Sequence, residues 1–322
     1  MNNQKLALFG GTKTINHEFK SYNPIGQDEV MAAKAVVESG LLSGFLGSPG
    51  PEFIGGPKVQ EFERACEKYF NVKHAVTVNS WTSGLITALG AIGIEPGDEV
   101  IVTPWTMSAS ATAILHWNAI PVFADIEQET FNINPKSIEA NITPNTKAIM
   151  AVDIFGHSCD IDLIMEIANH HNLKVITDSA QSPGAKYKKH NTGTLAHVGG
   201  YSLNRHKHIH TGEGGILVTN DDHIFERLQL IRNHAEAVVI GTGVEELNNM
   251  IGHNFRLGEI ECAIGIEQLK KLNGFVRGRQ HIAERLTQGL KGLPGLRTPI
   301  VNANCTHAYY KYPIVLDIDN LG

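Results

Sequence analysis

The sequence has few cysteines, and the ones it has form no pattern. Four of them (Cys66, Cys159, Cys262 and Cys305) are scattered over 322 residues without a Cys-x-x-Cys pair. This spacing argues against a disulfide framework and against a cysteine-ligated metal. We therefore expect reduced thiols in a cytoplasmic protein.

Long apolar runs and an excess of positive charge are missing as well. No apolar stretch approaches the roughly 20 residues that cross a bilayer, so we expect no membrane partner. Residues 1–5 lack the apolar core of a secretory signal, and we expect none. The formal net charge of −6 disfavours a nucleic-acid partner or an anionic membrane surface.

What the chain does contain is an alternation of short β-rich runs with helical runs. Strands are predicted at 75–78, 99–103, 120–124, 148–152, 174–177, 199–202 and 215–219, and helices at 28–39, 58–70, 82–92, 108–116, 161–171 and 222–233. This alternation predicts an α/β domain with a mainly parallel, seven-stranded sheet covered by helices. Ligands of such sheets bind at the carboxyl ends of the strands.

The pattern changes after residue 255. A long helix is predicted over 256–272, a second over 276–290, and a strand over 309–316. We divide the chain into an N-terminal segment with a large domain (1–255) and a connecting helix with part of a smaller α+β domain (256–322). One strand and parts of two helices make a poor core, so we expect the natural protein to continue.

Two polar motifs carry recognisable chemistry. Asp178 directly follows the apolar run 173–177, and Lys207 lies about thirty residues later, ahead of the Gly-Glu-Gly-Gly turn 212–215. A pyridoxal phosphate (PLP) enzyme needs such a lysine for a Schiff base with the cofactor aldehyde, and such an acid to keep the ring nitrogen protonated. Ser202 and backbone N–H groups are candidates to bind the phosphate. Taken alone, each residue is more often a surface group or a helix cap.

With these motifs in order, the sequence resembles the PLP-dependent sugar aminotransferases of the DegT/DnrJ/StrS type, a branch of the fold type I (aspartate aminotransferase) superfamily. The resemblance covers nearly the whole chain and rests on the segments 80–83, 104–107, 178–181, 202–215 and 252–256. It implies transfer of an amino group from glutamate or glutamine to a keto sugar, typically nucleotide-linked. It also implies a ping-pong mechanism through a Schiff base on Lys207.

The resemblance implies a role for each site residue. Lys207 and Asp178 are the catalytic pair, and Lys207 also moves the proton. Trp105 is expected to stack on the cofactor ring, and Gln181 to bind its phenolic oxygen. Asn254 is expected to reach the phosphate in a neighbouring subunit, which implies a homodimer with shared active sites. The full set of predicted cofactor-binding residues is Trp81, Thr82, Trp105, Asp178, Gln181, Ser202, Lys207 and Asn254.

Two departures from the family pattern leave questions open. Trp81 stands where the family generally has glycine, which leaves the geometry of the phosphate turn open. Arg205 and His206 replace a common Pro-Thr pair, and we hypothesise that Arg205 and the nearby histidines recognise an anionic part of the substrate. The alternating residues His206, His208 and His210 lack Cys or acidic partners, so a metal site is not favoured.

Three alternative functions stay open on the sequence. The first is an aminotransferase for a keto-cyclitol or another substrate without a nucleotide. The second is a PLP-dependent sugar dehydratase, in which a histidine replaces the lysine, and Lys207 argues against it. The third is a non-catalytic binding or regulatory protein on the same fold.

Overall fold

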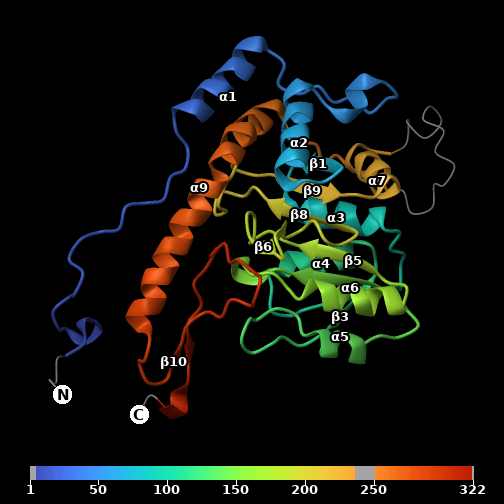
Figure 1. Cartoon of the computed structure of the whole chain (residues 1–322). Helices are drawn as coiled ribbons and strands as arrows, with labels where there is room; N and C mark the ends of the chain where they lie inside the picture. Colours follow the sequence, from blue (N-terminus) through green and yellow to red (C-terminus); the bar gives the residue numbers. More distant parts are fainter. Residues whose placement is uncertain (1–4, 236–250, 321–322) are drawn as a thin grey trace.

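The structure is a computed structural model that describes residues 5–235 and 251–320. Its centre is a seven-stranded sheet in the order β1-β9-β8-β5-β4-β2-β3 (Figure 1). The strands are β1 (His74–Val78), β2 (Glu99–Val102), β3 (Ile120–Phe123), β4 (Thr146–Val152), β5 (Lys174–Asp178), β8 (Val198–Ser202) and β9 (Gly215–Thr219). β9 pairs antiparallel with β1 and β8, and the other four strand pairs are parallel, so the predicted mainly parallel sheet is confirmed.

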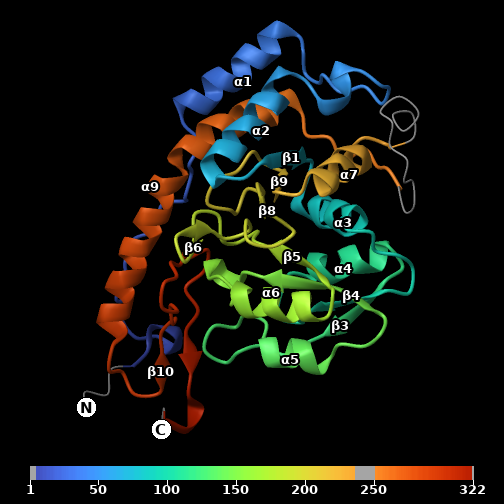
Figure 2. The ribbon, with the colours of Figure 1, turned by 45° about the vertical axis from the view of Figure 1, so that its right-hand side comes forward.

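Helices cover the sheet in the two views of Figures 1 and 2. They are α1 (Gln27–Ser39), α2 (Pro57–Phe70), α3 (Trp81–Ala91), α4 (Ser108–His116), α5 (Pro135–Ala140), α6 (Ile161–His170), α7 (Asp222–Arg232) and α9 (Glu259–Leu290). All seven predicted strands and the first six predicted helices are found within two residues of their predicted bounds, and the short α5 was not predicted.

Alternating side chains of the central strands enter two different cores. Val100 and Val102 pack with α3, α4 and α7 on one face, whereas Ile101 packs with α5 and α6 on the other. Both faces of the sheet are therefore apolar, as a sheet between two helical layers requires. The strand ends, which leave these cores, are free to carry polar side chains.

The predicted break between two C-terminal helices is wrong, because α9 is one helix of 32 residues. Gly274 lies at its centre and costs helix stability of about 1 kcal/mol relative to alanine. Leu272 and Val276, four residues apart on one helix face, are both buried, and Tyr69 donates a hydrogen bond to Asn273 (2.7 Å). Packing of this face therefore outweighs the local preference, and α9 lies beside α1 and α2 in both views.

The strand predicted over 309–316 is also largely wrong. Only β11 (Val315–Leu316) forms, paired with β10 (Leu296–Arg297). Upstream, Tyr309 has a left-handed backbone (φ 49°), and the chain is held by hydrogen bonds from Ala308 and Lys311 to backbone oxygens of residues 156 and 155. Tertiary contacts with the large domain thus replace strand pairing. The division into domains at residue 255 remains a prediction.

Among the described residues, no helix combines the length and apolarity that a bilayer crossing needs.

Candidate functional site

A cavity of about 350 Å³ lies where the carboxyl ends of β5 and β8 meet the first turns of α3 and α4. It is lined by Ser80, Trp81, Thr82, Thr106, Met107, Ala109, Asp178, Ala180, Gln181, Ser202, Asn204, His206, Lys207, Glu213 and Tyr310. Six of the eight predicted cofactor-binding residues are among them. Strand ends of a parallel sheet are where this fold class binds ligands.

Lys207 contributes a largely buried amine to this cavity. Burial lowers the pKa of Lys207, the positive charge of Lys311 lowers it further, and the carboxylate of Asp178 opposes both. Its Nζ lies 4.4 Å from the centre of the Tyr310 ring. A lowered pKa increases the fraction of free amine, which is the form that reacts with an aldehyde and accepts a proton.

Asp178 is held in one orientation by three neutral donors. Its Oδ1 accepts hydrogen bonds from Trp81 Nε1 (2.7 Å) and from the backbone N–H of Ala180 (3.2 Å). Its Oδ2 accepts one from Ser110 Oγ (2.8 Å), which in turn contacts Thr106 Oγ1 (2.9 Å). The side chain is only 5% exposed.

No salt bridge in the part of the chain that the structure describes includes Asp178, although its charge acts on Lys207. A buried carboxylate is costly without a positive partner. A protonated ring nitrogen in the cavity would supply that partner.

The first turn of α3 forms the wall suited to a phosphate. Ser80 caps the helix, and its Oγ accepts a hydrogen bond from the N–H of Ser83 (3.1 Å). The N–H groups of Trp81 and Thr82 have no partner within a helix because they belong to its first turn. Together with the helix dipole and the hydroxyl of Ser202 on the same cavity, they form an anion-binding set.

Gln181 lies on the cavity wall, and Trp105 does not. The Oε1 of Gln181 accepts a hydrogen bond from the N–H of Phe155 (2.8 Å), which leaves the amide nitrogen to donate. Trp105 is half exposed and stacks on Phe131, with ring centres 6.0 Å apart. The position of Trp105 therefore gives no support to the stacking role predicted for it, and Met107 occupies the wall instead.

Asn254 also lies outside the cavity lining. Its backbone forms an isolated antiparallel bridge with Asn233. The prediction that it reaches the phosphate of a neighbouring subunit concerns a second chain, and it stays a prediction.

The three alternating histidines have three different environments. His206 is exposed and lines the cavity. His208 is fully buried and donates from Nε2 to the backbone oxygen of Ala308 (2.8 Å), whereas Nδ1 of His210 accepts from the N–H of Gly212 (3.3 Å). Across residues 5–235 and 251–320, no group of three or more His, Cys, Asp or Glu side chains is placed to hold a metal ion.

Sequence reasoning missed three residues of the site. Ser110 lies inside a helix and has no local signal, because only the fold brings it to Asp178. Met107 belongs to the segment 104–107 that carries the resemblance, but the resemblance assigns the contact with the cofactor ring to Trp105. Tyr310 arrives from more than one hundred residues downstream of Lys207, and no spacing in the sequence predicts that approach.

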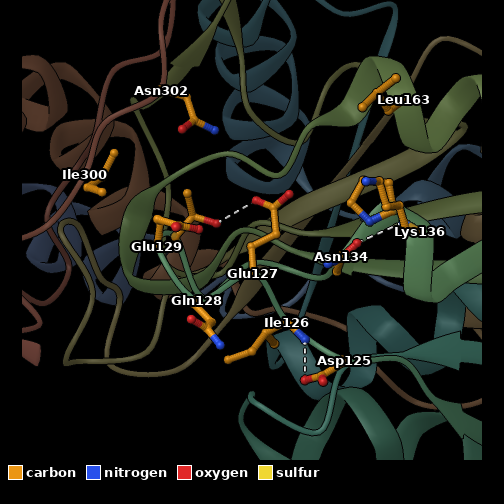
Figure 3. A pocket seen from close by; sticks show the side chains of 12 residues that line it. Asp125, Ile126, Glu127, Gln128, Glu129, Asn134, Lys136, Leu163, Ile300 and Asn302 are labelled. Atoms are coloured by element: carbon orange, nitrogen blue, oxygen red, sulfur yellow. Dashed lines mark hydrogen bonds between the residues drawn. The ribbon is translucent and has the colours of Figure 1, made fainter.

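A larger cavity of about 760 Å³ lies elsewhere and has unsuitable chemistry (Figure 3). Asp125, Glu127 and Glu129 lie on its wall with one lysine, Lys136. Three carboxylates repel an anionic ligand. Charge therefore selects the smaller cavity as the candidate active site.

The residues of the smaller cavity fit PLP. It offers a lysine for the aldehyde, a buried carboxylate for the ring nitrogen and a helix N-terminus for the phosphate. These three groups belong to Lys207, Asp178 and the first turn of α3. PLP-dependent chemistry needs this set.

Comparison with known proteins gives one consistent result. Residues 48–321 match the model of the DegT/DnrJ/EryC1/StrS aminotransferase family. The chain is 36% identical over 305 residues to the spore coat polysaccharide biosynthesis protein SpsC of Bacillus subtilis, covering 92% of this chain and 75% of that protein. It is 38% identical over 266 residues to the GDP-perosamine synthase of Caulobacter vibrioides, covering 81% and 70%. A putative L-glutamine:3-amino-2,3-dideoxy-scyllo-inosose aminotransferase of Streptomyces kanamyceticus is 33% identical over 299 residues, covering 93% and 69%.

Solved structures agree with these relatives. An aminotransferase from Psychrobacter cryohalolentis superposes with a TM-score of 0.85 at 32% identity, covering 95% of this chain and 79% of that one. The GDP-4-keto-6-deoxy-D-mannose-3-dehydratase of E. coli, solved with bound hydrated PLP, gives a TM-score of 0.81 at 26% identity, covering 94% and 79%. The chain therefore belongs to the DegT/DnrJ/EryC1/StrS aminotransferase family and is a PLP-dependent aminotransferase of the fold type I architecture.

Proposed function

We propose that the enzyme transfers an amino group from glutamate or glutamine to a nucleotide-linked keto sugar. The observation that carries this proposal is the convergence of Lys207, Asp178 and the first turn of α3 on one cavity. The named activity of the Caulobacter relative, GDP-perosamine synthesis, supports a nucleotide-linked acceptor. The protein would act in the cytoplasm, where its four free cysteines stay reduced.

Each residue of the cavity has a defined task in this proposal. When bound, PLP supplies an electron sink that stabilises negative charge on the reacting carbon. Asp178 keeps the ring nitrogen protonated, and the N–H groups of Trp81 and Thr82 hold the phosphate together with Ser202. Gln181 donates to the phenolic oxygen. These contacts fix the plane in which a substrate must bind.

Lys207 is the proposed proton carrier. Its amine would hold PLP as a Schiff base. Once free, the same amine would take the proton from the donor Cα and deliver it to the aldehyde carbon (C4′) of the cofactor. Burial lowers the pKa of Lys207 and so increases the fraction of its amine that is free to accept a proton.

Both substrates would use the cavity in turn, which predicts ping-pong kinetics. The donor leaves as a keto acid before the keto sugar enters, so the amino group and the carbonyl oxygen are exchanged between them. Exposed His206 on the cavity wall, with Arg205 beside it (3.4 Å between Nε and Nε2), supports recognition of an anionic part of the acceptor.

A homodimer with shared active sites completes the proposal. Asn254 lies outside the cavity of its own subunit, and the proposal assigns it to the phosphate of the neighbouring one. The division at residue 255 would then separate the large domain from α9 and the smaller domain.

The first experiment is the visible spectrum of the purified protein with PLP, before and after glutamate. We expect a cofactor–lysine band that glutamate bleaches, that is absent in Lys207→Ala, and that persists in Lys311→Ala. Lys311 is a matched control because its Nζ lies 6.0 Å from the same Tyr310 ring. A band that persists in Lys207→Ala would overturn the assignment of Lys207.

A keto-cyclitol acceptor is the second candidate, and the Streptomyces relative favours it. After glutamate or glutamine has bleached the band, keto sugars with and without a nucleotide and keto-cyclitols are added in turn. The acceptor that restores the band is the substrate class. Restoration by the cyclitol alone would replace the nucleotide-sugar proposal.

Sugar dehydration is a weaker candidate. It requires a histidine in the place of the lysine, whereas the neighbouring His208 is buried and bonded to the oxygen of Ala308. Lys207 itself lies on the cavity wall. We therefore expect no dehydration of the keto sugar in the absence of an amino donor.

A further inference from the structure

The Trp81 side chain points from the first turn of α3, where the phosphate would bind, into the interior of the protein. Trp81 is the first residue of α3, yet only 6% of it is exposed, and its indole belongs to the core between α3 and the sheet. From there its Nε1 donates to Oδ1 of Asp178 over 2.7 Å, a short bond between buried groups. Hydrogen bonds to ionised acceptors are the strong ones, and burial strengthens them further.

The surrounding chain makes room for this indole. A Cβ on Gly84 would lie 2.8 Å from Cε3 of Trp81, and one on Gly200 would lie 2.5 Å from its Cη2. One glycine is on the helix and the other on β8, so the ring is enclosed from both sides. The indole therefore has one tightly defined position, with its N–H directed at the carboxylate.

Trp81 and Ser110 donate to different oxygens of the Asp178 carboxylate. Trp81 and the backbone N–H of Ala180 bind Oδ1, whereas Ser110 binds Oδ2. All three donors are neutral, so they fix the orientation of the carboxylate without supplying a positive charge. A cationic partner in the cavity can therefore still pair with it.

We infer that Trp81 is a positioning residue that holds the Asp178 carboxylate oriented toward the nitrogen of the cofactor ring. This inference rests on the proposed role of Asp178 and adds a task for a side chain that phosphate binding does not use. The backbone N–H of Trp81 would bind the phosphate, and its indole N–H holds the carboxylate that would pair with the ring nitrogen.

The test compares Trp81→Phe with Trp117→Phe. Phenylalanine keeps an aromatic ring and removes the N–H donor. Trp117 is the matched control, since it is buried and donates from Nε1 to the oxygen of Ile86 (2.8 Å) away from the cavity. We expect Trp81→Phe to raise the dissociation constant of PLP about tenfold, because a bond to a charged group is worth about that factor. Trp117→Phe should leave that constant unchanged, even where it lowers thermal stability.

A second measurement does not depend on whether a variant at position 81 folds, because it uses the native Trp81. The three tryptophans give three indole N–H resonances in the cofactor-free protein, and Trp105→Phe and Trp117→Phe assign them by elimination. The Trp81 resonance should move on Asp178→Asn and on addition of PLP, and the Trp117 resonance should not.

The outcomes separate this inference from the proposed function. The positioning role would be overturned if folded Trp81→Phe kept the wild-type dissociation constant for PLP, or if Asp178→Asn left the Trp81 resonance unchanged. Either result would leave the lysine-dependent band, and with it the proposed function, in place. Absence of that band in the wild-type protein would overturn the proposed function instead.

Discussion

The two walls of the active-site cavity are built in different ways. One, the strand-end wall, comprises Asp178 and Ser202 at the ends of β5 and β8 and the first turn of α3. The other, the C-terminal wall, is the segment 305–311, which carries Tyr310 and has only isolated bridges as secondary structure. The sheet fixes the first wall, whereas side chains and single backbone hydrogen bonds hold the second.

The hydrogen bonds of the C-terminal wall show how it is held. Ala308 bonds to Gly156 through its N–H and to His208 through its oxygen, and Arg279 and Gln280 of α9 donate to oxygens of residues 309 and 307. Regular elements thus carry the groups that chemistry requires, and an irregular segment closes the site. We expect the strand-end wall to determine activity and the C-terminal wall to modulate it.

The largest effect should follow from breaking the strand-end wall. Asp178→Ala removes the partner of the ring nitrogen and leaves Trp81 Nε1 and Ser110 Oγ without their acceptor. We expect transaminase kcat to fall about a hundredfold or more, the range for loss of a preorganised electrostatic group. Single-turnover kinetics with glutamate measure it. Asp125→Ala, at the other cavity, is the control, and a fall below tenfold in Asp178→Ala would contradict the assignment.

The second-largest effect should come from acid, which lowers the free energy of unfolding through three buried histidines. Burial lowers the pKa of His157 to about 4 and those of His208 and His307 to about 3. The unfolded chain binds these protons near pH 6.5 and the folded chain does not, so stability falls as pH drops from about 6.5 toward 4. Three such groups contribute a slope of about 4 kcal/mol per pH unit.

One buried acid offsets part of this slope. Burial raises the pKa of Asp153 to about 6, so below pH 6 the folded chain gains a proton that the unfolded chain gains only near pH 4. For these three histidines and Asp153 together, the net expectation is about two protons taken up on unfolding between pH 6 and 4. Urea unfolding at several pH values measures it. His307→Gln should reduce the uptake by about one proton, and exposed His190→Gln should not change it. A pH-independent midpoint would contradict the prediction.

A smaller effect should follow from changing Tyr310. Its ring lies 4.4 Å from Nζ of Lys207 and stabilises the ammonium form. Tyr310→Leu should therefore lower the pKa of Lys207 further and change kcat/KM about two- to fivefold, whereas Tyr310→Phe should retain most of the effect. The pH dependence of Lys207 acylation in cofactor-free protein reports the pKa directly. Equal profiles for the Leu variant and the wild type would disprove the ring contact.

The smallest effect concerns α9, which leads to the C-terminal wall. A Cβ on Gly274 would meet no atom within 4 Å, so Gly274→Ala should fit without strain. We expect it to raise the free energy of unfolding by about 1 kcal/mol, because alanine is the better helix former. Thermal unfolding measures it, with unchanged kcat as the control. Destabilisation would show that the helix is not continuous at this point in solution.

The strand-end wall was largely predictable from sequence because its signals are local. The apolar runs that make β5 and β8 end at Asp178 and Ser202, and the Ser80 cap marks the start of α3. Parallel strands bring their carboxyl ends to one edge, so the meeting of these residues followed from the period of the pattern.

The prediction failed where packing overrides local preference. Two helices were predicted, over 256–272 and 276–290, but the buried Leu272 and Val276 hold α9 as one helix across the predicted break. Residues 309–316 read as a strand, yet only Val315 and Leu316 pair with a neighbouring strand, and Lys311 donates to the backbone oxygen of Phe155 instead. The stacking role that the resemblance implies for Trp105 stays a prediction, because the structure shows only that this side chain packs against Phe131 and does not line the cavity.

By itself the sequence determined the sheet and most helices and placed Asp178 at a strand end, because periodicity and strand-end position are local properties; Lys207 and Asp178 remain the proposed chemical pair. Only the tertiary structure decided which donors hold Asp178. Trp81 and Ser110 lie 97 and 68 residues away from it along the chain. The same holds for Tyr310 above Lys207. Such contacts depend on which strands become neighbours and on glycines that admit an indole, and these are properties of the packed sheet.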